Sequence, residues 1–182
     1  MKNKSIIIKI FFLIIIVILG FFLLEKNKDH VAIQAKNIKA KVELIDNEKD
    51  YQIKKLDSEK VNGEQITDGG GQLIGYFKDG NISKIEEHLG LSHGVKTYQY
   101  YFVDDELILV EEKDEGFSDP LNTGTLDYTK LELVFKGQYY FKKGKLFNTE
   151  TIGVKRFPQE ENINIEDFFL KAAQENIELL RS

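Results

Sequence analysis

One segment of this 182-residue chain has the residue types and spacing of a catalytic motif. Gly90-Leu91-Ser92-His93-Gly94 matches the G-x-S-x-G pattern of a nucleophile elbow, in which the serine attacks an ester or amide. That chemistry needs a strand–turn–helix around the serine and a histidine base later in the chain. The three histidines are His30, His88 and His93, and the segment is predicted to join two strands. We therefore interpret it as a loop, and a small hydrolase centred on it is the least favoured alternative.

The remaining polar clusters do not have the spacing of known binding sites. The Glu and His side chains within residues 86–93 lack three or four ligands at zinc-site intervals. The acidic residues within 104–119 lack the alternating order of a calcium loop, and glycines 69–71 are not followed by the Lys-Ser/Thr of a phosphate loop. We predict no catalytic residue, no metal and no cofactor, and therefore a protein that is not an enzyme.

The charge and the cysteine content exclude several other classes of protein. The chain has 25 Lys and Arg, 30 Asp and Glu, and no cysteine. A disulfide framework, a Cys-ligated metal and a lipid-modified cysteine are therefore excluded. All 30 acidic side chains follow residue 24, whereas three of the basic ones precede it, so the net charge of the later part is −8 rather than −5. A domain this acidic is not expected to bind nucleic acid.

The first residues have the composition of a membrane-spanning segment. Ile6 to Leu24 is apolar except for Lys9 and Gly20. At about 1.5 Å per residue, the segment is long enough to cross most of a roughly 30 Å hydrocarbon core. The largely charged residues 25–29 that follow make a poor signal-peptidase site, which favours an uncleaved anchor.

The lysines near the N-terminus indicate the orientation of such an anchor. Lys2, Lys4 and Lys9 precede the span, whereas the two lysines just beyond it are offset by two acids. The positive-inside rule then predicts a single-pass protein of the cell membrane with a cytoplasmic N-terminus and an extracytoplasmic domain. We assign residues 1–29 to the anchor and juxtamembrane segment, and residues 30–182 to one α+β domain. Cleavage of the leader, giving a secreted or periplasmic domain, is the alternative.

Hydrophobic periodicity predicts a helix on each side of a β-rich middle. Apolar residues recur at helical intervals between Val31 and Leu56, which predicts an amphipathic helix over 31–57. A glycine-rich loop then extends to Gly71. Near the C-terminus, an asparagine within 162–164 can cap a helix over 165–180.

Three similar segments in the middle of the chain predict three β-hairpins. Each contains adjacent Tyr and Phe residues, a two-residue turn and the start of a second strand; the segments are Gly75–Ile82, Tyr100–Leu107 and Tyr139–Leu146. Two-residue turns place three aromatic–aliphatic pairs on one face of the sheet. These pairs are Phe77–Ile82, Phe102–Leu107 and Phe141–Leu146.

The predicted fold class is α+β. We expect an N-terminal membrane helix, an amphipathic helix, a six-stranded antiparallel meander of three hairpins, and a C-terminal helix packed on one sheet face. The amphipathic helix is expected on that same face, because one face of the meander alternates as if buried and the other as if exposed to water.

The hairpin sequence Tyr-Tyr-Phe-x-x-Gly-x-Leu, complete at Tyr139–Leu146, resembles that of a group of bacterial exported or envelope proteins of unknown function. In that group an N-terminal helix, a Gly-Gly loop and a meander rich in Tyr and Phe precede a C-terminal helix, and the resemblance covers residues 31–181. Repeats of the MORN type and related antitoxin repeats have similar Tyr/Gly spacing. Asp105 stands where the turn glycine of the pattern belongs. The resemblance implies export and this fold, and it implies no activity.

The strongest candidate for a binding site is an aromatic row on the opposite sheet face. With the three phenylalanines directed at the helices, the neighbouring side chains point away from them. The candidate partner-binding residues are Tyr76, Tyr101, Ile108, Tyr140 and Phe147. In the expected register Tyr76 lies opposite Ser83, Tyr101 opposite Ile108 and Tyr140 opposite Phe147, with Ile74, Ile85, Val103 and Val110 on the same face. An uncovered aromatic face suits a protein, peptide or glycan, although tyrosine and β-branched residues also simply favour strands.

Together these features predict a non-enzymatic, membrane-anchored envelope protein whose sheet domain binds an unknown envelope protein or glycan. An inhibitor or immunity module that blocks an incoming toxin or lysozyme is the main alternative, and the small hydrolase is less favoured.

Overall fold

The computed structural model describes residues 29–57, 69–119, 124–154 and 164–182. The chain forms two compact units, residues 1–37 and residues 38–182. Residues 29–37, the described part of the first unit, are helical, and the helix continues to residue 47 in the second unit.

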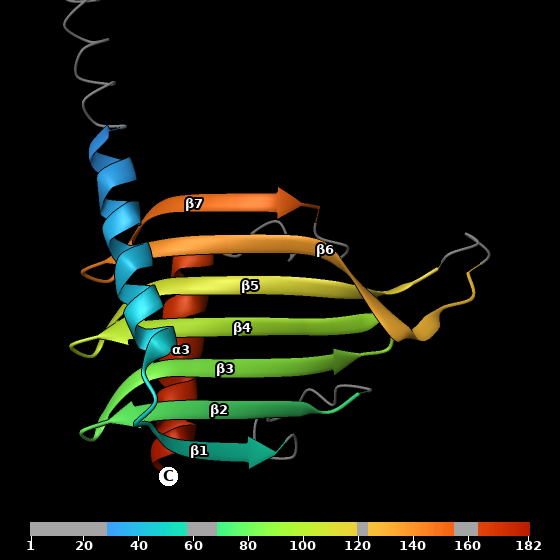
Figure 1. The fold of residues 1–182 in the computed structure, drawn as a ribbon, viewed down its shortest axis with the longest axis horizontal. Helices are drawn as coiled ribbons and strands as arrows, with labels where there is room; N and C mark the ends of the chain where they lie inside the picture. Colours follow the sequence, from blue (N-terminus) through green and yellow to red (C-terminus); the bar gives the residue numbers. More distant parts are fainter. Residues whose placement is uncertain (1–28, 58–68, 120–123, 155–163) are drawn as a thin grey trace, which may run out of the picture. The chain divides into compact units, whose positions relative to one another are not determined.

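The second unit is built on one antiparallel sheet of seven strands that follow each other in chain order (Figure 1). The strands are β1 (Gln52–Asp57), β2 (Gly71–Lys78), β3 (Asn81–Leu91), β4 (Gly94–Val103), β5 (Glu106–Ser118), β6 (Asp127–Lys142) and β7 (Lys145–Gly153). The predicted antiparallel meander is confirmed, but the predicted number of six strands is wrong. The additional strand is β1, which lies within the predicted helix 31–57.

The helix ends at residue 47, and four polar or aromatic residues separate it from β1. Residues 52–57 form a strand instead of continuing the helix, because as a strand they pair with β2 through backbone hydrogen bonds. Gln52 pairs with Phe77, and Asp57 pairs with Gln72. The apolar spacing of Ile53 and Leu56 also fits a helix, so pairing between distant segments decides the structure here.

The three predicted two-residue turns are confirmed. Both central residues of each turn have φ between 51° and 82°. The turns are Asp79-Gly80, Asp104-Asp105 and Lys143-Gly144. This left-handed backbone follows the right-handed twist of the strands, as in a type I′ turn.

The aromatic–aliphatic pairs beside these turns are also confirmed, since Phe77 pairs with Ile82, Phe102 with Leu107 and Phe141 with Leu146. One residue farther along, each hairpin contains a β-bulge on its second strand. The extra residues are Ser83, Ile108 and Phe147.

The bulges make the expected pairing beyond the phenylalanines wrong. Tyr76 pairs with Lys84, Tyr101 with Leu109 and Tyr140 with Asn148. A bulged residue reverses the side-chain alternation of the strand that follows it. Ile85 and Val110 therefore belong to the main hydrophobic core rather than to the opposite face.

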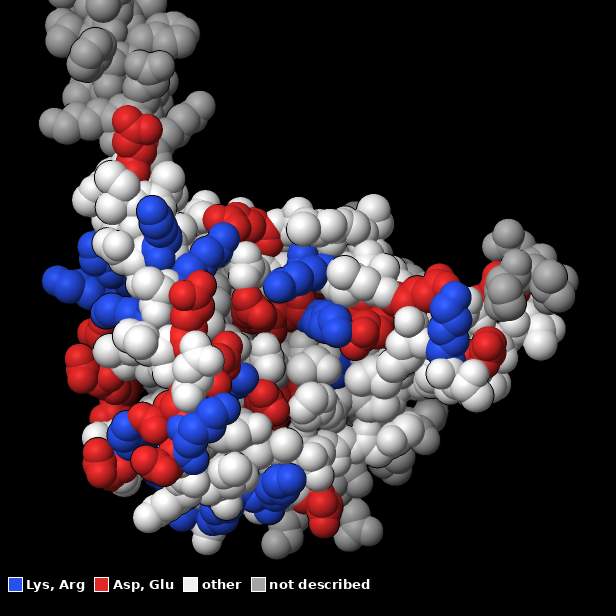
Figure 2. All heavy atoms as spheres, viewed as in Figure 1, with Lys and Arg blue, Asp and Glu red and all other residues white. Residues whose placement is uncertain are grey.

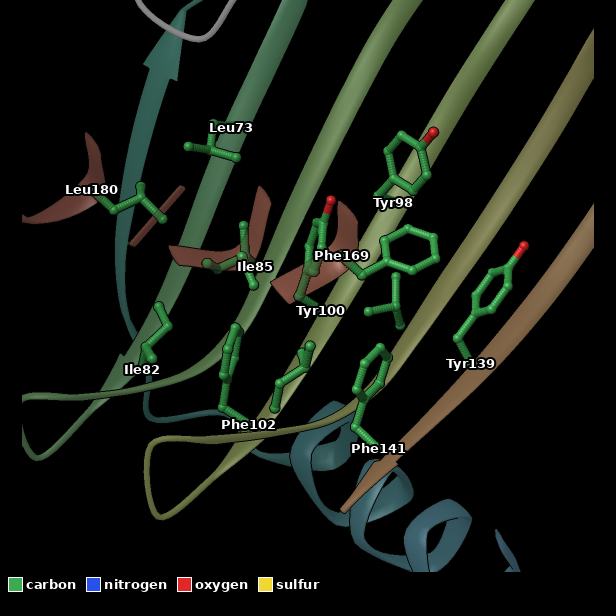
Figure 3. Packing of buried hydrophobic residues seen from close by; sticks show 13 residues of the cluster. Leu73, Ile82, Ile85, Tyr98, Tyr100, Phe102, Tyr139, Phe141, Phe169 and Leu180 are labelled. Carbon is green, nitrogen blue, oxygen red and sulfur yellow. The ribbon is translucent and has the colours of Figure 1, made fainter. Parts of the chain in front are cut away.

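Helix α3 (Ile165–Arg181) covers one face of the sheet and forms this core. Asn164 caps it, because the side-chain oxygen accepts a hydrogen bond from the amide of Glu166 at 3.0 Å. Phe169 lies at the centre of an aromatic cluster with Tyr98, Tyr100 and Tyr139 (Figure 3). The position of α3 on one sheet face agrees with the prediction.

The prediction that both helices share this face is wrong. Residues 38–47 cross the opposite face, where Asp46 contacts Lys84 and Tyr101, and the unit has three layers: helix, sheet and helix (Figure 1). The face opposite α3 is therefore not fully exposed, because residues 38–47 cover the end of it that is nearest the three turns.

The predicted membrane span, Ile6 to Leu24, lies outside the described residues. Among the residues that are described, neither helix is long and apolar enough to cross a membrane.

Candidate functional site

The five candidate partner-binding residues lie at the end of the sheet nearest the hairpin turns. We call the sheet surface that carries Tyr76, Tyr101 and Tyr140 the tyrosine face, and residues 38–47 the strap. Tyr101 and Tyr140 are 1% and 0% exposed and Ile108 is 8% exposed, whereas Tyr76 and Phe147 are half-buried. Two of the five side chains are thus accessible with the strap in place.

The hydroxyl groups of the three tyrosines point along the strands to a second row of side chains. Tyr76 donates a hydrogen bond to Glu86 at 3.0 Å, and Tyr101 donates to Gln99 at 3.2 Å. Tyr140 donates to Gln138 at 3.2 Å. Burial raises the pKa of Tyr101 and of Tyr140, so both hydroxyls keep the proton that they donate.

The second row alternates glutamate and glutamine across five neighbouring strands. It consists of Glu86, Gln99, Glu111, Gln138 and Glu150, one each from β3 to β7. Gln99 donates to Glu86 at 2.9 Å, and Gln138 donates to Glu111. Every member of this Glu/Gln row has planar oxygen or nitrogen groups that can form hydrogen bonds.

The strap is held over the tyrosine face by charged side chains near both of its ends. Asp46 accepts a hydrogen bond from the Lys84 ammonium at 2.8 Å, and it shares the single proton of the Tyr101 hydroxyl with Gln99, each acceptor lying 3.2 Å from that hydroxyl. Lys39 donates to Glu150 at 2.8 Å, and its ammonium lies 5.6 Å from the centre of the Tyr140 ring. The next residues continue this pattern, because Glu48 pairs with Lys78.

These ion pairs change the pKa values of their members in the expected directions. Burial opposes the charge of Lys84, but hydrogen bonds to Asp46 and Glu86 outweigh this effect and raise its pKa. The hydrogen bond from Lys39 lowers the pKa of Glu150, and the hydrogen bond from Lys78 lowers the pKa of Glu48 to about 2. Glu150 and Glu48 are therefore ionised at neutral pH, and each pairs with a lysine.

Figure 2 shows the tyrosine face with acidic and basic side chains side by side on the strap and on the sheet beyond it. His88 lies in the next row of this face, with its Nε2 3.7 Å from Glu86 and its Nδ1 3.3 Å from the hydroxyl of Thr97. The charges alternate in sign and do not form a single-sign patch.

The α3 face contains a buried cluster that the sequence did not reveal. Register places Glu87, Tyr98 and Glu112 side by side on β3, β4 and β5. Glu112 is 0% exposed; it accepts hydrogen bonds from Tyr139 at 2.9 Å and from Lys96 at 3.4 Å. We call Glu87, Tyr98 and Glu112 the carboxylate row.

Glu87 differs electrostatically from an ordinary surface carboxylate. Burial raises its pKa, and this effect outweighs the hydrogen bonds that it accepts from Asn176 of α3 at 3.4 Å and from Tyr100 at 3.3 Å. The sequence contains a signal for this position. After the bulge at Ser83, every second residue faces the core, and this alternation places Glu87 on the core side between Ile85 and Leu89.

The Ser92-His93 pair forms a two-residue turn between β3 and β4, with Leu91 paired to Gly94. Both flanking segments are strands, so the segment does not have the strand–turn–helix arrangement of a nucleophile elbow. Within the described ranges, no three or more His, Asp or Glu side chains are grouped so that they could hold a metal ion.

Comparison with known proteins found no matching family model, no matching curated protein and no matching solved structure. The function must therefore be inferred from the sheet surfaces themselves.

Proposed function

We propose that the chain is a non-enzymatic envelope protein with a single membrane span over about Ile6–Leu24. The N-terminus is cytoplasmic, and the sheet domain lies outside the cytoplasmic membrane, where it binds another envelope component, a protein or a glycan. The apolar leader with its preceding lysines supports the membrane anchor.

The observation that carries the binding proposal is the combination of the Glu/Gln row with the three tyrosines on one face. Five neighbouring strands present planar hydrogen-bonding groups beside aromatic rings. The Glu and Gln side chains can donate and accept hydrogen bonds, and tyrosine is enriched among the residues that dominate binding energy at protein interfaces. The contact residues of this proposal are Tyr76, Tyr101, Ile108, Tyr140 and Phe147, together with the Glu/Gln row.

The location can be tested by cysteine labelling, because the chain has no cysteine of its own. Ser92→Cys places a thiol in an exposed turn, and Lys4→Cys places one before the span. In intact cells, a membrane-impermeant maleimide should label Ser92→Cys, whereas Lys4→Cys should be labelled only after permeabilisation. Labelling of Ser92→Cys only after permeabilisation would contradict the proposal, and release of a shortened chain from the membrane would favour a secreted domain.

The binding face can be tested by site-specific photocrosslinking in cells. A benzophenone amino acid at Phe147, beside the Tyr140 ring, should give a discrete adduct. Glu111→Ala with Gln138→Ala should reduce that adduct about tenfold, since two hydrogen-bonding groups are lost without touching the strap. Lys130→Ala with Glu132→Ala removes an exposed polar pair elsewhere and is the matched control. An adduct that is unchanged by the first pair of substitutions would exclude this face.

A further inference from the structure

The two helices that cover the sheet are held by different interactions. Apolar residues of α3 pack into the main hydrophobic core, with Phe169 and Leu180 each 1% exposed. The strap contributes no residue to that core, and Val42 is its one buried side chain, with 8% of its surface exposed. Its other contacts to the sheet described above are ion pairs, hydrogen bonds and the position of the Lys39 ammonium over the Tyr140 ring; of these, the Lys39–Glu150 pair is exposed and therefore individually weak.

The strap contacts two of the tyrosines that the proposed function assigns to the binding of a partner. The Tyr101 hydroxyl bonds to Asp46 of the strap, and the Tyr140 ring lies beneath Lys39. These two tyrosines can therefore meet a partner only if the strap leaves its position.

The sheet under the strap has a charge polarity that specifies what can replace it. Lys84 of β3 pairs with the Asp46 carboxylate of the strap. Glu150 of β7, four strands away, pairs with the Lys39 ammonium of the strap. Val42 is the buried residue of the strap between these two charges. Along the strap helix it lies about one turn from Lys39 and one turn from Asp46. A segment that satisfies both charges must present a base and an acid about two helical turns apart, with an apolar residue between them.

We propose that the strap is an exchangeable helical segment that covers the partner-binding site, and that the site's ligand is an amphipathic helix of a partner protein with the same charge polarity. The strap and the partner helix compete for the tyrosine face. This inference rests on the location of the proposed binding face, and it selects a helical protein over a glycan as the ligand.

The test uses the strap's own sequence as the probe. A fluorescent peptide of residues 36–49 is titrated into the full-length chain in detergent micelles. In the wild-type chain the attached strap acts at an effective concentration in the millimolar range and excludes the peptide. Lys39→Gln with Asp46→Asn in the chain removes both ion pairs from the strap but leaves Lys84 and Glu150 for the peptide.

The peptide should bind this double variant at least about tenfold more tightly than the wild-type chain, because two ion pairs have been lost by the competitor. A peptide that carries the same two substitutions is the matched control and should lose most of this gain. Hydrogen exchange of residues 38–47 should accelerate in the double variant while that of α3 is unchanged.

Equal binding of the peptide to both chains would overturn the inference, as would a gain that the neutral peptide reproduces. Accelerated exchange of the strap without any peptide binding would also overturn it. None of these results depends on an envelope partner, so failure here leaves the crosslinking test of the proposed function intact, and failure of that test leaves this one interpretable.

Discussion

Tyr139 reaches Glu112 because the residue beneath its ring has no side chain. A Cβ atom at Gly137 would lie 2.8 Å from both the ring and the hydroxyl of Tyr139. The ring therefore lies along its own strand, and its hydroxyl bonds to Glu112 at 2.9 Å. A glycine in the middle of β6 is costly for a strand, and this contact explains why it is there.

We expect Gly137→Ala to lower the free energy of unfolding by about 1–3 kcal/mol, because it displaces Tyr139 from a carboxylate that is fully buried. Urea denaturation of the variant gives the value. Tyr139→Phe removes the same hydrogen bond without crowding and should account for part of the loss. A Gly137→Ala variant as stable as the wild type would show that the ring can move without cost.

Glu87 gives a prediction about pH. Its folded-state pKa is raised, so its ionisation opposes folding at neutral pH, and this cost disappears as the pH falls to the ordinary value of 4.5. The stability of the wild type relative to Glu87→Gln should therefore increase as the pH is lowered from 7 to about 4.5. Chemical denaturation at several pH values tests the sign. A difference that stays constant or decreases would contradict the assignment.

The carboxylate row also marks the limit of prediction at the residue scale. The facing pairs next to each turn followed from two-residue loops and were correct. Beyond Ser83 and Ile108 the alternation reverses, and Ile85 and Val110 take the opposite face from the one expected. A bulge has no strong sequence signature, so Glu87 and Glu112 could not be separated from the general acidity of the chain.

At the scale of elements, the three turns allow a matched pair of substitutions. Asp105 and Gly144 occupy the same position of two equivalent turns, with φ of 59° and 67°. No atom lies within 4 Å of a Cβ built at Gly144, so a substitution there reports on the backbone conformation. The ion pair from Arg181 to Asp105 is exposed and 3.8 Å long, and it contributes little.

We therefore expect opposite changes from Asp105→Gly and Gly144→Asp. The first should raise the free energy of unfolding by about 0.5–1 kcal/mol, and the second should lower it by a similar amount. Thermal and urea denaturation of the two variants measure the difference. Changes of the same sign would mean that these turns are not equivalent in strain.

The N-terminal helix and β1 show why the element boundaries could not all be predicted. Residues 52–57 alternate poorly, and Ile53 remains 55% exposed in the edge strand. Neither a helix nor a strand is favoured strongly by such a segment, and its pairing with β2 depends on residues about twenty positions away. In contrast, α3 has a cap and a clear apolar side, and its bounds were predicted closely.

At the scale of the whole domain, the side of the sheet that each helix covers was the main error. Both helical segments are amphipathic in sequence, and periodicity does not say which sheet face an apolar stripe will meet. The structure separates them by chemistry: α3 packs on aromatic rings, whereas the strap is fastened by ion pairs to Lys84 and Glu150.

This separation predicts that acid acts oppositely on the two layers. The pKa of Glu150 and that of Glu48 are lowered by their lysines, so their stabilisation is present above the ordinary value of 4.5 and is lost as the pH falls towards the folded values, about 2 for Glu48. Glu87, which accepts from Asn176 of α3, has a raised pKa, so protonation relieves a cost on that face.

The strap should therefore be released before the α3 layer as the pH is lowered below about 4. Amide resonances of residues 38–47 should lose their helical shifts first, while those of α3 remain, and added salt should shift the release towards neutral pH by screening the ion pairs. Glu48→Gln with Glu150→Gln removes two of these pairs but leaves Asp46 on Lys84, so it should accelerate hydrogen exchange of residues 38–47 at pH 7. Simultaneous loss of both helices would show that acid unfolds the domain as one unit and that the ion pairs of the strap do not control its position.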